Sequence, residues 1–130
     1  MIVLDASAAV EWLLQTSAGQ RIENRIYSRN ETLHAPHLLD LEVTQVLRRL
    51  ALQAVVSVHR AGEAVRDLLD LRITRYPHLL LLPRIWQLRH NVSAYDAAYI
   101  VLAEKLGATL VTRDARLASA SGHAAPVELF

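Results

Sequence analysis

The 130-residue chain contains no cysteine and only four glycines. The lack of cysteine excludes disulfides, thiolate zinc sites, iron–sulfur clusters and a cysteine nucleophile. The glycines stand at positions 19, 62, 107 and 122, a spacing that fits neither a P-loop nor a dinucleotide-binding fingerprint. A Gly-x-Ser-x-Gly nucleophile elbow is also missing. Any catalytic chemistry must therefore come from other side chains.

No sign of charge is in large excess. The chain has 14 basic and 13 acidic residues and a net charge of +1, which is too balanced to indicate a nucleic-acid partner by itself. Lys105 is the only lysine, so the other basic residues are arginines. Arginine suits bidentate contacts with phosphate, although a general bias in composition explains the same count.

Long hydrophobic runs and a targeting signal are lacking too. The start of the chain has no basic region, and its first apolar run, Ile2 to Leu4, ends at Asp5. We therefore expect no signal peptide. The apolar runs are too short to cross a bilayer. With 52% apolar and 21% charged residues, the sequence predicts one packed domain over residues 1–130, without membrane association and located in the cytoplasm.

The pattern of apolar residues predicts strands alternating with helices. We expect strands at residues 2–4, 32–35, 72–75, 109–112 and 127–130. We expect helices at 7–14 with Ser7 as N-cap, at 19–29, at 38–52 with Asp40 as N-cap, after Ser57, at 83–89, and at 94–106 between Ser93 and Gly107. This alternation favours an α/β fold of three layers, α/β/α, with a short parallel sheet covered on both faces.

Two acidic residues follow predicted strands directly. Asp5 ends the first apolar strand, and Asp114 lies two residues after the strand at 109–112. Ligands of open α/β sheets bind at this carboxyl edge. Each residue can equally be the cap of the helix that follows it.

Two further acids lie near helix starts. Glu42 falls inside the apolar stripe of its helix, where a carboxylate is costly unless it is neutralised; the alternatives are a position at the rim or an ion pair with Arg48 or Arg49. Asp96 lies three residues after Ser93, which also fits a capping box.

In a doubly wound sheet these four positions meet at one rim, so we expect the four carboxylates within a few ångströms of one another. Such a cluster needs raised pKa values or a cation. Without cysteine, and with six histidines that show no metal-binding spacing, the expected ion is Mg²⁺, or Mn²⁺ as a substitute. Carboxylate clusters of this kind favour hydrolysis of phosphodiesters.

Four blocks of sequence carry a resemblance to a known family. They are residues 2–7 (IVLDAS), Ala35-Pro36 followed by Glu42, residues 91–99 (NVSAYDAAY) and residues 110–114 (LVTRD). In this order and spacing they resemble the PIN domain, and specifically the VapC toxins of bacterial VapBC toxin–antitoxin pairs. Many members carry a further acid shortly after the fourth acid. Here Ala115, Arg116 and Leu117 follow Asp114, so this ligand for a second metal ion is missing from that place.

The resemblance implies a metal-dependent endoribonuclease that cleaves tRNA or rRNA. It assigns Mg²⁺ coordination and catalysis to Asp5, Glu42, Asp96 and Asp114, with Ser7 and Thr112 as supporting polar residues. It also implies a cognate VapB antitoxin that blocks the site, a toxin homodimer, and a toxin–antitoxin hetero-oligomer.

Other features keep alternatives open. Arg113 and Arg116 flank Asp114 and can hold an RNA backbone or be ordinary solvated charge. Tyr95 or Trp12 can stack on a base or belong to the core, and the leucines at 79–82 can line a groove, a dimer seam or the core.

Two other enzyme or signalling classes fit less well. A response-regulator receiver needs a lysine late in the chain at the end of a strand, but Lys105 lies inside a predicted helix. A haloacid-dehalogenase-type phosphatase needs Asp-x-Asp after the first strand, but position 7 is serine. A catalytically silent PIN-fold module that binds RNA or protein stays possible.

Overall fold

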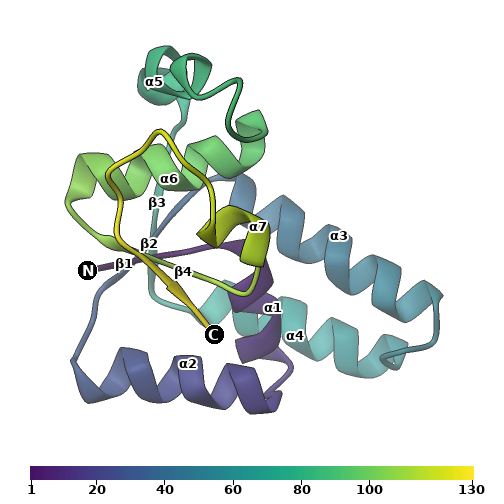
Figure 1. Ribbon diagram of the computed structural model, residues 1–130. Helices are drawn as coiled ribbons and strands as arrows, with labels where there is room; N and C mark the ends of the chain where they lie inside the picture. Colours follow the sequence, from purple (N-terminus) through teal and green to yellow (C-terminus); the bar gives the residue numbers. More distant parts are fainter.

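The computed structural model describes residues 1–130 and contains a five-stranded, wholly parallel sheet (Figure 1). The strand order is β3-β2-β1-β4-β5. The strands are β1 (Ile2–Leu4), β2 (Leu33–Pro36), β3 (Ile73–Tyr76), β4 (Thr109–Thr112) and β5 (Val127–Leu129). β1 lies in the middle and is completely buried, which explains why it is a continuous apolar run. The predicted three-layer α/β fold is confirmed.

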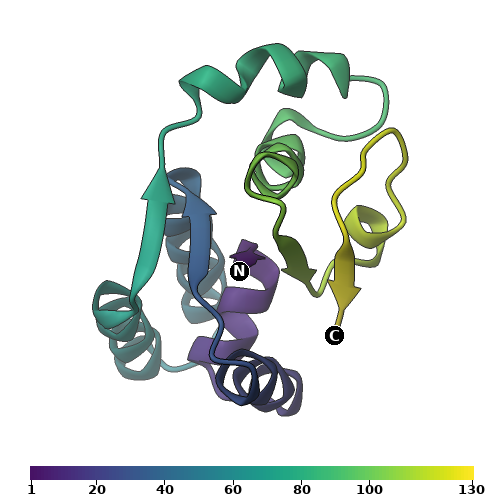
Figure 2. The ribbon, with the colours of Figure 1, turned by 90° about the vertical axis from the view of Figure 1, so that its left-hand side faces the viewer.

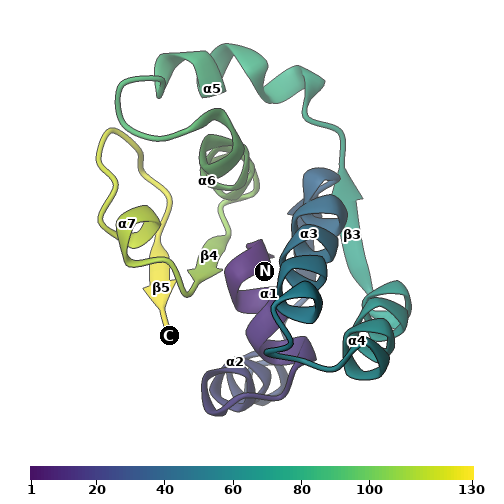
Figure 3. The ribbon, with the colours of Figure 1, turned by 90° about the vertical axis from the view of Figure 1, so that its right-hand side faces the viewer.

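Helices cover both faces of the sheet (Figures 2 and 3). One face carries the first four helices and the other carries the last three. The helices are α1 (Ala6–Leu13), α2 (Ser17–Ser28), α3 (Leu38–Leu52), α4 (Val58–Asp70), α5 (Leu82–Gln87), α6 (Ala94–Leu106) and α7 (Ala115–Ala118), with a 3₁₀ turn, η1, at Leu79–Leu81. None of these helices is long and apolar enough to span a membrane.

Helix α6 is the central helix of its layer. Its residues from Ala97 to Ala103 are all buried, because the sheet lies on one side and α5 packs on the other. A helix buried all round has no polar face, so α6 is apolar in every direction apart from its ends. Ser93 caps its start and Gly107, in the left-handed conformation with φ 62°, ends it, both as predicted.

The chain reverses its direction of winding at β1. From β1 it moves outward to β2 and β3, and then it crosses back over the sheet to β4 on the other side of β1. The carboxyl ends of β1 and β4 therefore form the switch point of the sheet, where ligands bind in open α/β folds. Asp5 and Asp114 follow these two strands.

Several local predictions are wrong. Asp5, and not Ser7, caps α1, because its carboxylate accepts a hydrogen bond from the backbone N–H of Ala8. Asp40 is not the N-cap of α3: His37 holds that place, and the Asp40 carboxylate pairs instead with Arg75 of β3 at 2.8 Å. Strand β2 covers Leu33–Pro36 and thus includes Pro36, which lies outside the predicted range 32–35.

Candidate functional site

All four predicted acids line one cavity at the carboxyl edge of the sheet. The cavity has a volume of about 390 Å³. Its wall consists of Asp5, Ala6, Ser7, Leu41, Glu42, Gln45, Val46, Asp96, Tyr99 and Asp114. The expected meeting of two strand ends with the starts of α3 and α6 is therefore present.

Asp5 is the most deeply placed of the acids, with 4% of its surface exposed. Its Oδ1 accepts hydrogen bonds from the Ala8 N–H at 2.9 Å and from the Ser7 hydroxyl at 2.7 Å. Its Oδ2 accepts a hydrogen bond from the Thr112 hydroxyl. These three donors fix the orientation of the carboxylate, and they satisfy the ionised form best.

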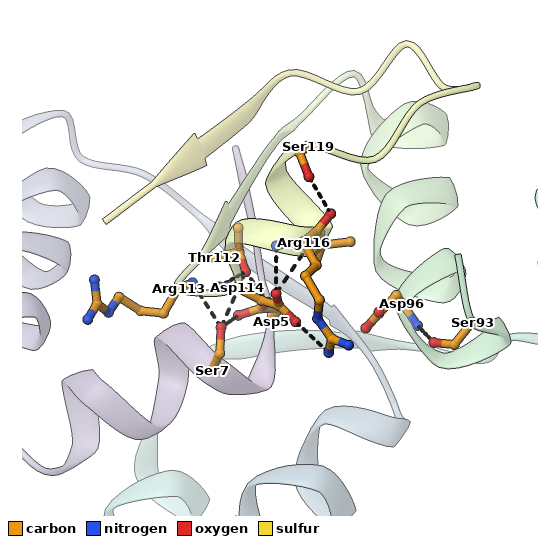
Figure 4. A network of polar contacts seen from close by, with 10 residues as sticks. Asp5, Ser7, Ser93, Asp96, Thr112, Arg113, Asp114, Arg116 and Ser119 are labelled. Atoms are coloured by element: carbon orange, nitrogen blue, oxygen red, sulfur yellow. Dashed lines mark hydrogen bonds and ion pairs between the residues drawn. The ribbon is translucent and has the colours of Figure 1, made fainter. Parts of the chain in front are cut away.

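Ser7 and Thr112 connect Asp5 to the turn that carries Asp114 (Figure 4). The Ser7 hydroxyl accepts a hydrogen bond from the Arg113 N–H at 2.8 Å, and the Thr112 hydroxyl accepts one from the Asp114 N–H at 2.9 Å. Asp114 itself caps α7, because its Oδ1 accepts from the N–H groups of Arg116 and Leu117. The two hydroxyls thus hold the ends of β1 and β4 in a fixed relation.

Glu42 lies on the first turns of α3 and is half-buried. Its Oε2 accepts a hydrogen bond from the Tyr99 hydroxyl at 2.7 Å, and this is its only hydrogen bond. The alternative ion pair with Arg48 or Arg49 is absent. In the apolar stripe this carboxylate is therefore stabilised by a neutral hydrogen-bond donor and not by a cation.

Asp96 lies on the first turn of α6, where its N–H donates to the Ser93 hydroxyl at 3.2 Å. The capping interpretation is thus correct for the backbone, while the side chain lines the cavity. Both roles hold together, as they do for Asp5 and Asp114.

Burial and mutual repulsion raise the pKa of three of the acids. For Asp5, Glu42 and Asp96 the largest cause is burial, which disfavours the charged form. Charge repulsion adds to it: Asp96 acts on Asp5, Asp96 and Asp5 act on Glu42, and Asp114 acts on Asp96. The pKa of the Tyr99 phenol is also raised, first by burial and then by Glu42, so it stays protonated as a donor. The cavity thus concentrates negative charge that its hydrogen bonds only partly balance.

The donor set of the cavity fits a hard divalent cation. Four carboxylates line it, and only Asp114 has a cationic partner, Arg116, whose Nη2 lies 3.5 Å from Oδ2. In the present conformation, however, no three acidic or histidine side chains are close enough together to hold one ion. The expected spacing of a few ångströms is therefore not reached by three of them at once. Direct ligation of one ion by three of these carboxylates therefore requires a change of rotamer in some of them, whereas ligation by fewer carboxylates and water does not.

The two arginines beside Asp114 point in different directions (Figure 4). The Arg113 guanidinium turns away from the carboxylates and contacts the Phe130 carbonyl, with Glu11 at 4.0 Å. Arg116 is almost fully exposed and reaches toward Asp114 and Asp96, and its charge only partly offsets the rise in the pKa of Asp96 that burial and Asp114 cause. Only Arg116 presents its charge at the mouth of the cavity.

The aromatic and leucine candidates differ in whether they are buried or exposed. Trp12 is buried in the core, while Tyr95 is 67% exposed next to Asp96. Of the leucines at 79–82, only Leu81 is buried; the other three are exposed on the surface of the single chain.

Tyr99 and Gln45 are cavity residues that the sequence analysis did not single out. Their spacing could have identified them, because each lies three residues after an acid of the site on the same helix: Tyr99 after Asp96 and Gln45 after Glu42. Residues at this spacing share a face of a helix.

Comparisons with known proteins agree with this arrangement. The sequence profile of the family described as "PIN domain" matches residues 2–122. The chain is 43% identical over 129 residues to Ribonuclease VapC12 of Mycobacterium tuberculosis, covering 99% of this chain and 98% of that protein. Two solved structures have a similar fold at low identity. VapC20 of M. tuberculosis, a Sarcin-Ricin loop cleaving toxin, has a TM-score of 0.69 at 16% identity, covering 95% of this chain and 97% of that one. VapBC2 of Rickettsia felis, bound to a DNA fragment of its promoter, has a TM-score of 0.69 at 14% identity, with 99% and 98% covered.

Proposed function

The chain belongs to the PIN domain family and, within it, to the VapC ribonucleases, and from this membership we propose that it is a Mg²⁺-dependent endoribonuclease of a type II toxin–antitoxin pair. The observation that carries the metal-dependent part is the convergence of Asp5, Glu42, Asp96 and Asp114 on one cavity at the switch point of the sheet. Mn²⁺ is expected to substitute for Mg²⁺, since both prefer oxygen ligands.

The four carboxylates are the proposed ligands. A bound Mg²⁺ supplies acidification of a water molecule and neutralisation of charge on the phosphoryl oxygens. Asp5, fixed by three hydrogen bonds, and Asp114, fixed as the cap of α7, provide the rigid part of the ligand set, while Asp96, more exposed than Asp5, provides the adjustable part. Ser7 and Thr112 act by orienting Asp5 and by holding the Asp114 turn.

Hydrolysis by an activated water does not use the 2′-hydroxyl of RNA as a nucleophile. We therefore expect products with a 5′-phosphate and a 3′-hydroxyl. Asp96 or Glu42 is the proposed acceptor of the proton from the attacking water, because both line the cavity, have raised pKa values and accept fewer hydrogen bonds than Asp5.

The partners follow from the relatives. Ribonuclease VapC12 supports an RNA substrate, and the VapBC2 structure supports a VapB-type antitoxin as partner. We propose further that the RNA is tRNA or rRNA and that the antitoxin inhibits the site. A homodimer, a toxin–antitoxin hetero-oligomer and a cytoplasmic location complete the proposal.

One observation favours a second candidate. Because no three carboxylates are placed to hold one ion, a catalytically silent module that binds RNA or protein through the same fold is the alternative. The two differ in whether the carboxylates are needed for cleavage.

RNA cleavage by the purified protein, measured with Mg²⁺ and with EDTA, tests the proposal. We expect Asp5→Asn to lower the cleavage rate at least about 100-fold, since removal of a ligand forfeits several kcal/mol of transition-state stabilisation. Asparagine keeps a side-chain oxygen for the cap of α1, so the fold is retained. Asp40→Asn is the matched control, because Asp40 pairs with Arg75 and does not line the cavity. Equal cleavage by the wild type and Asp5→Asn, or by the wild type with and without EDTA, would refute the metal-dependent nuclease.

A further inference from the structure

Glu42 is held in the cavity by a single neutral contact. Its carboxylate is half-buried, lines the cavity and has no cationic partner, and the Tyr99 hydroxyl at 2.7 Å from Oε2 is its only hydrogen-bond donor. A glutamate side chain has several rotatable bonds, and fixing it in one rotamer costs conformational entropy. Without this donor, no hydrogen bond or ion pair holds the Glu42 carboxylate toward the other acids.

Tyr99 is suited to this task because its ring cannot move. Only 1% of the residue is exposed, and it lies on α6 among the continuously buried residues. It is three residues after Asp96, so one helix presents both a cavity acid and the donor that orients another. The hydroxyl therefore has a defined position relative to Asp96 and, across the layer, to α3.

The neutrality of the donor matters for a cation site. An arginine or lysine beside Glu42 would cancel its charge and weaken its attraction for a metal ion. A phenol orients the carboxylate and leaves the charge in place, and the second oxygen, Oε1, keeps no hydrogen bond to the protein. Hydrogen-bond donors to ligating carboxylates typically contribute 10- to 100-fold to metal affinity or activity.

We propose that Tyr99 is the positioning residue for Glu42: its hydroxyl holds Glu42 in the orientation in which Glu42 ligates a divalent cation. The proposal rests on the proposed function, since it presupposes that the cavity binds such an ion. It adds Tyr99 to the four acids and to Ser7 and Thr112, as a residue that does not itself touch the ion.

Binding of Mn²⁺ to the purified protein, followed by the electron paramagnetic resonance signal of the free ion, tests this role without any RNA. We expect Tyr99→Phe, which removes only the hydroxyl, to raise the Kd for Mn²⁺ about tenfold or more. Tyr76→Phe is the matched control: its hydroxyl also hydrogen-bonds a side chain, His34 at 2.9 Å, but it lies on β3 and does not line the cavity. Its Kd should equal that of the wild type.

A double-mutant cycle separates positioning from a general structural effect. If Tyr99 acts through Glu42, Tyr99→Phe should change the Kd less than twofold when Glu42 is already alanine. An undiminished tenfold loss in the Glu42→Ala background would overturn the role, as would an unchanged Kd in Tyr99→Phe alone.

The outcomes also distinguish the two proposals. If the wild type binds Mn²⁺ and Tyr99→Phe binds it equally well, only the positioning role fails. If the wild type does not bind Mn²⁺ at millimolar concentration, the metal site fails and the role of Tyr99 fails with it.

Discussion

At the scale of single residues, the acids of the site do two things at once. Asp5 accepts three hydrogen bonds, and a carboxylate has about four acceptor positions, so roughly one remains for a cation. Asp114 likewise accepts from two backbone N–H groups of α7 while its other oxygen faces Arg116. The capping alternatives considered from the sequence are therefore correct and do not compete with a site. Each cap places a carboxylate at a strand end.

The two arginines beside Asp114 should differ in their effect on RNA. We expect Arg116→Ala to raise KM several-fold at low salt and to reduce the salt dependence by about one phosphate contact, because Arg116 is exposed at the cavity mouth. Arg113→Ala is the control, since its guanidinium faces away from the carboxylates and contacts the Phe130 carbonyl. KM measured over a series of salt concentrations checks this. Equal changes in both variants would count against the assignment of Arg116.

At the scale of elements, capping residues in the sequence correctly predicted helix ends that depend only on neighbouring residues. Helix α6 begins and ends where Ser93 and Gly107 predict, because the cap and the left-handed residue lie in the sequence itself. Asp40 shows the opposite case. From the sequence it looks like a cap of α3, but its carboxylate pairs with Arg75, 35 positions further along the chain. Only the pairing of β2 with β3 brings Arg75 near. The actual partner of Glu42 was missed for the same reason: the sequence offers an ion pair with Arg48 or Arg49 as an alternative, but the donor, Tyr99, lies on another helix.

Helix α2 depends on a close approach at Gly19. A Cβ atom there would lie 2.0 Å from the Glu11 carbonyl oxygen of α1. We expect Gly19→Ala to lower the free energy of unfolding by about 2 kcal/mol or more, because α1 and α2 must separate. Gly62→Ala in α4 is the control: its nearest atom would be 3.8 Å away, so the higher helix propensity of alanine should stabilise the protein by about 0.5 to 1 kcal/mol. Urea unfolding of both variants measures this. A stable Gly19→Ala protein would contradict the α1–α2 packing.

At the scale of the whole molecule, topology brings together acids that are distant in sequence. Strand ends and helix starts meet at the switch point, so the positions of Asp5, Glu42, Asp96 and Asp114 on one cavity were predictable from the order of elements. Side-chain distances were not, because they depend on rotamers. Nor was the exposure of three of the four leucines at 79–82, which depends on how η1 and α5 lie over α6.

The charge gathered in the cavity should make stability depend on pH. Asp5, Glu42 and Asp96 have pKa values raised above those of the unfolded chain, mainly by burial, so the folded state binds their protons more tightly. Their contribution to stability is therefore present below about pH 4 and is lost as the pH rises through the raised values. We expect the melting temperature of the wild type, relative to that of Asp5→Asn, to fall across this range without metal.

Divalent cations should reverse this loss. At pH 7, Mn²⁺ at 100 times its Kd stabilises the folded state by about 2.7 kcal/mol, or roughly 10 °C in melting temperature. Differential scanning calorimetry of both proteins, with and without Mn²⁺, measures the two effects. The same Mn²⁺ shift in Asp5→Asn as in the wild type would contradict a shared site.

The most direct measurement is an anomalous difference map from crystals soaked in Mn²⁺. We expect one strong peak in the cavity, ligated by oxygens of Asp5 and of at least two of the other three acids, with Glu42 still bonded to Tyr99. A map with no peak in the cavity, and the carboxylates unmoved, would contradict this expectation.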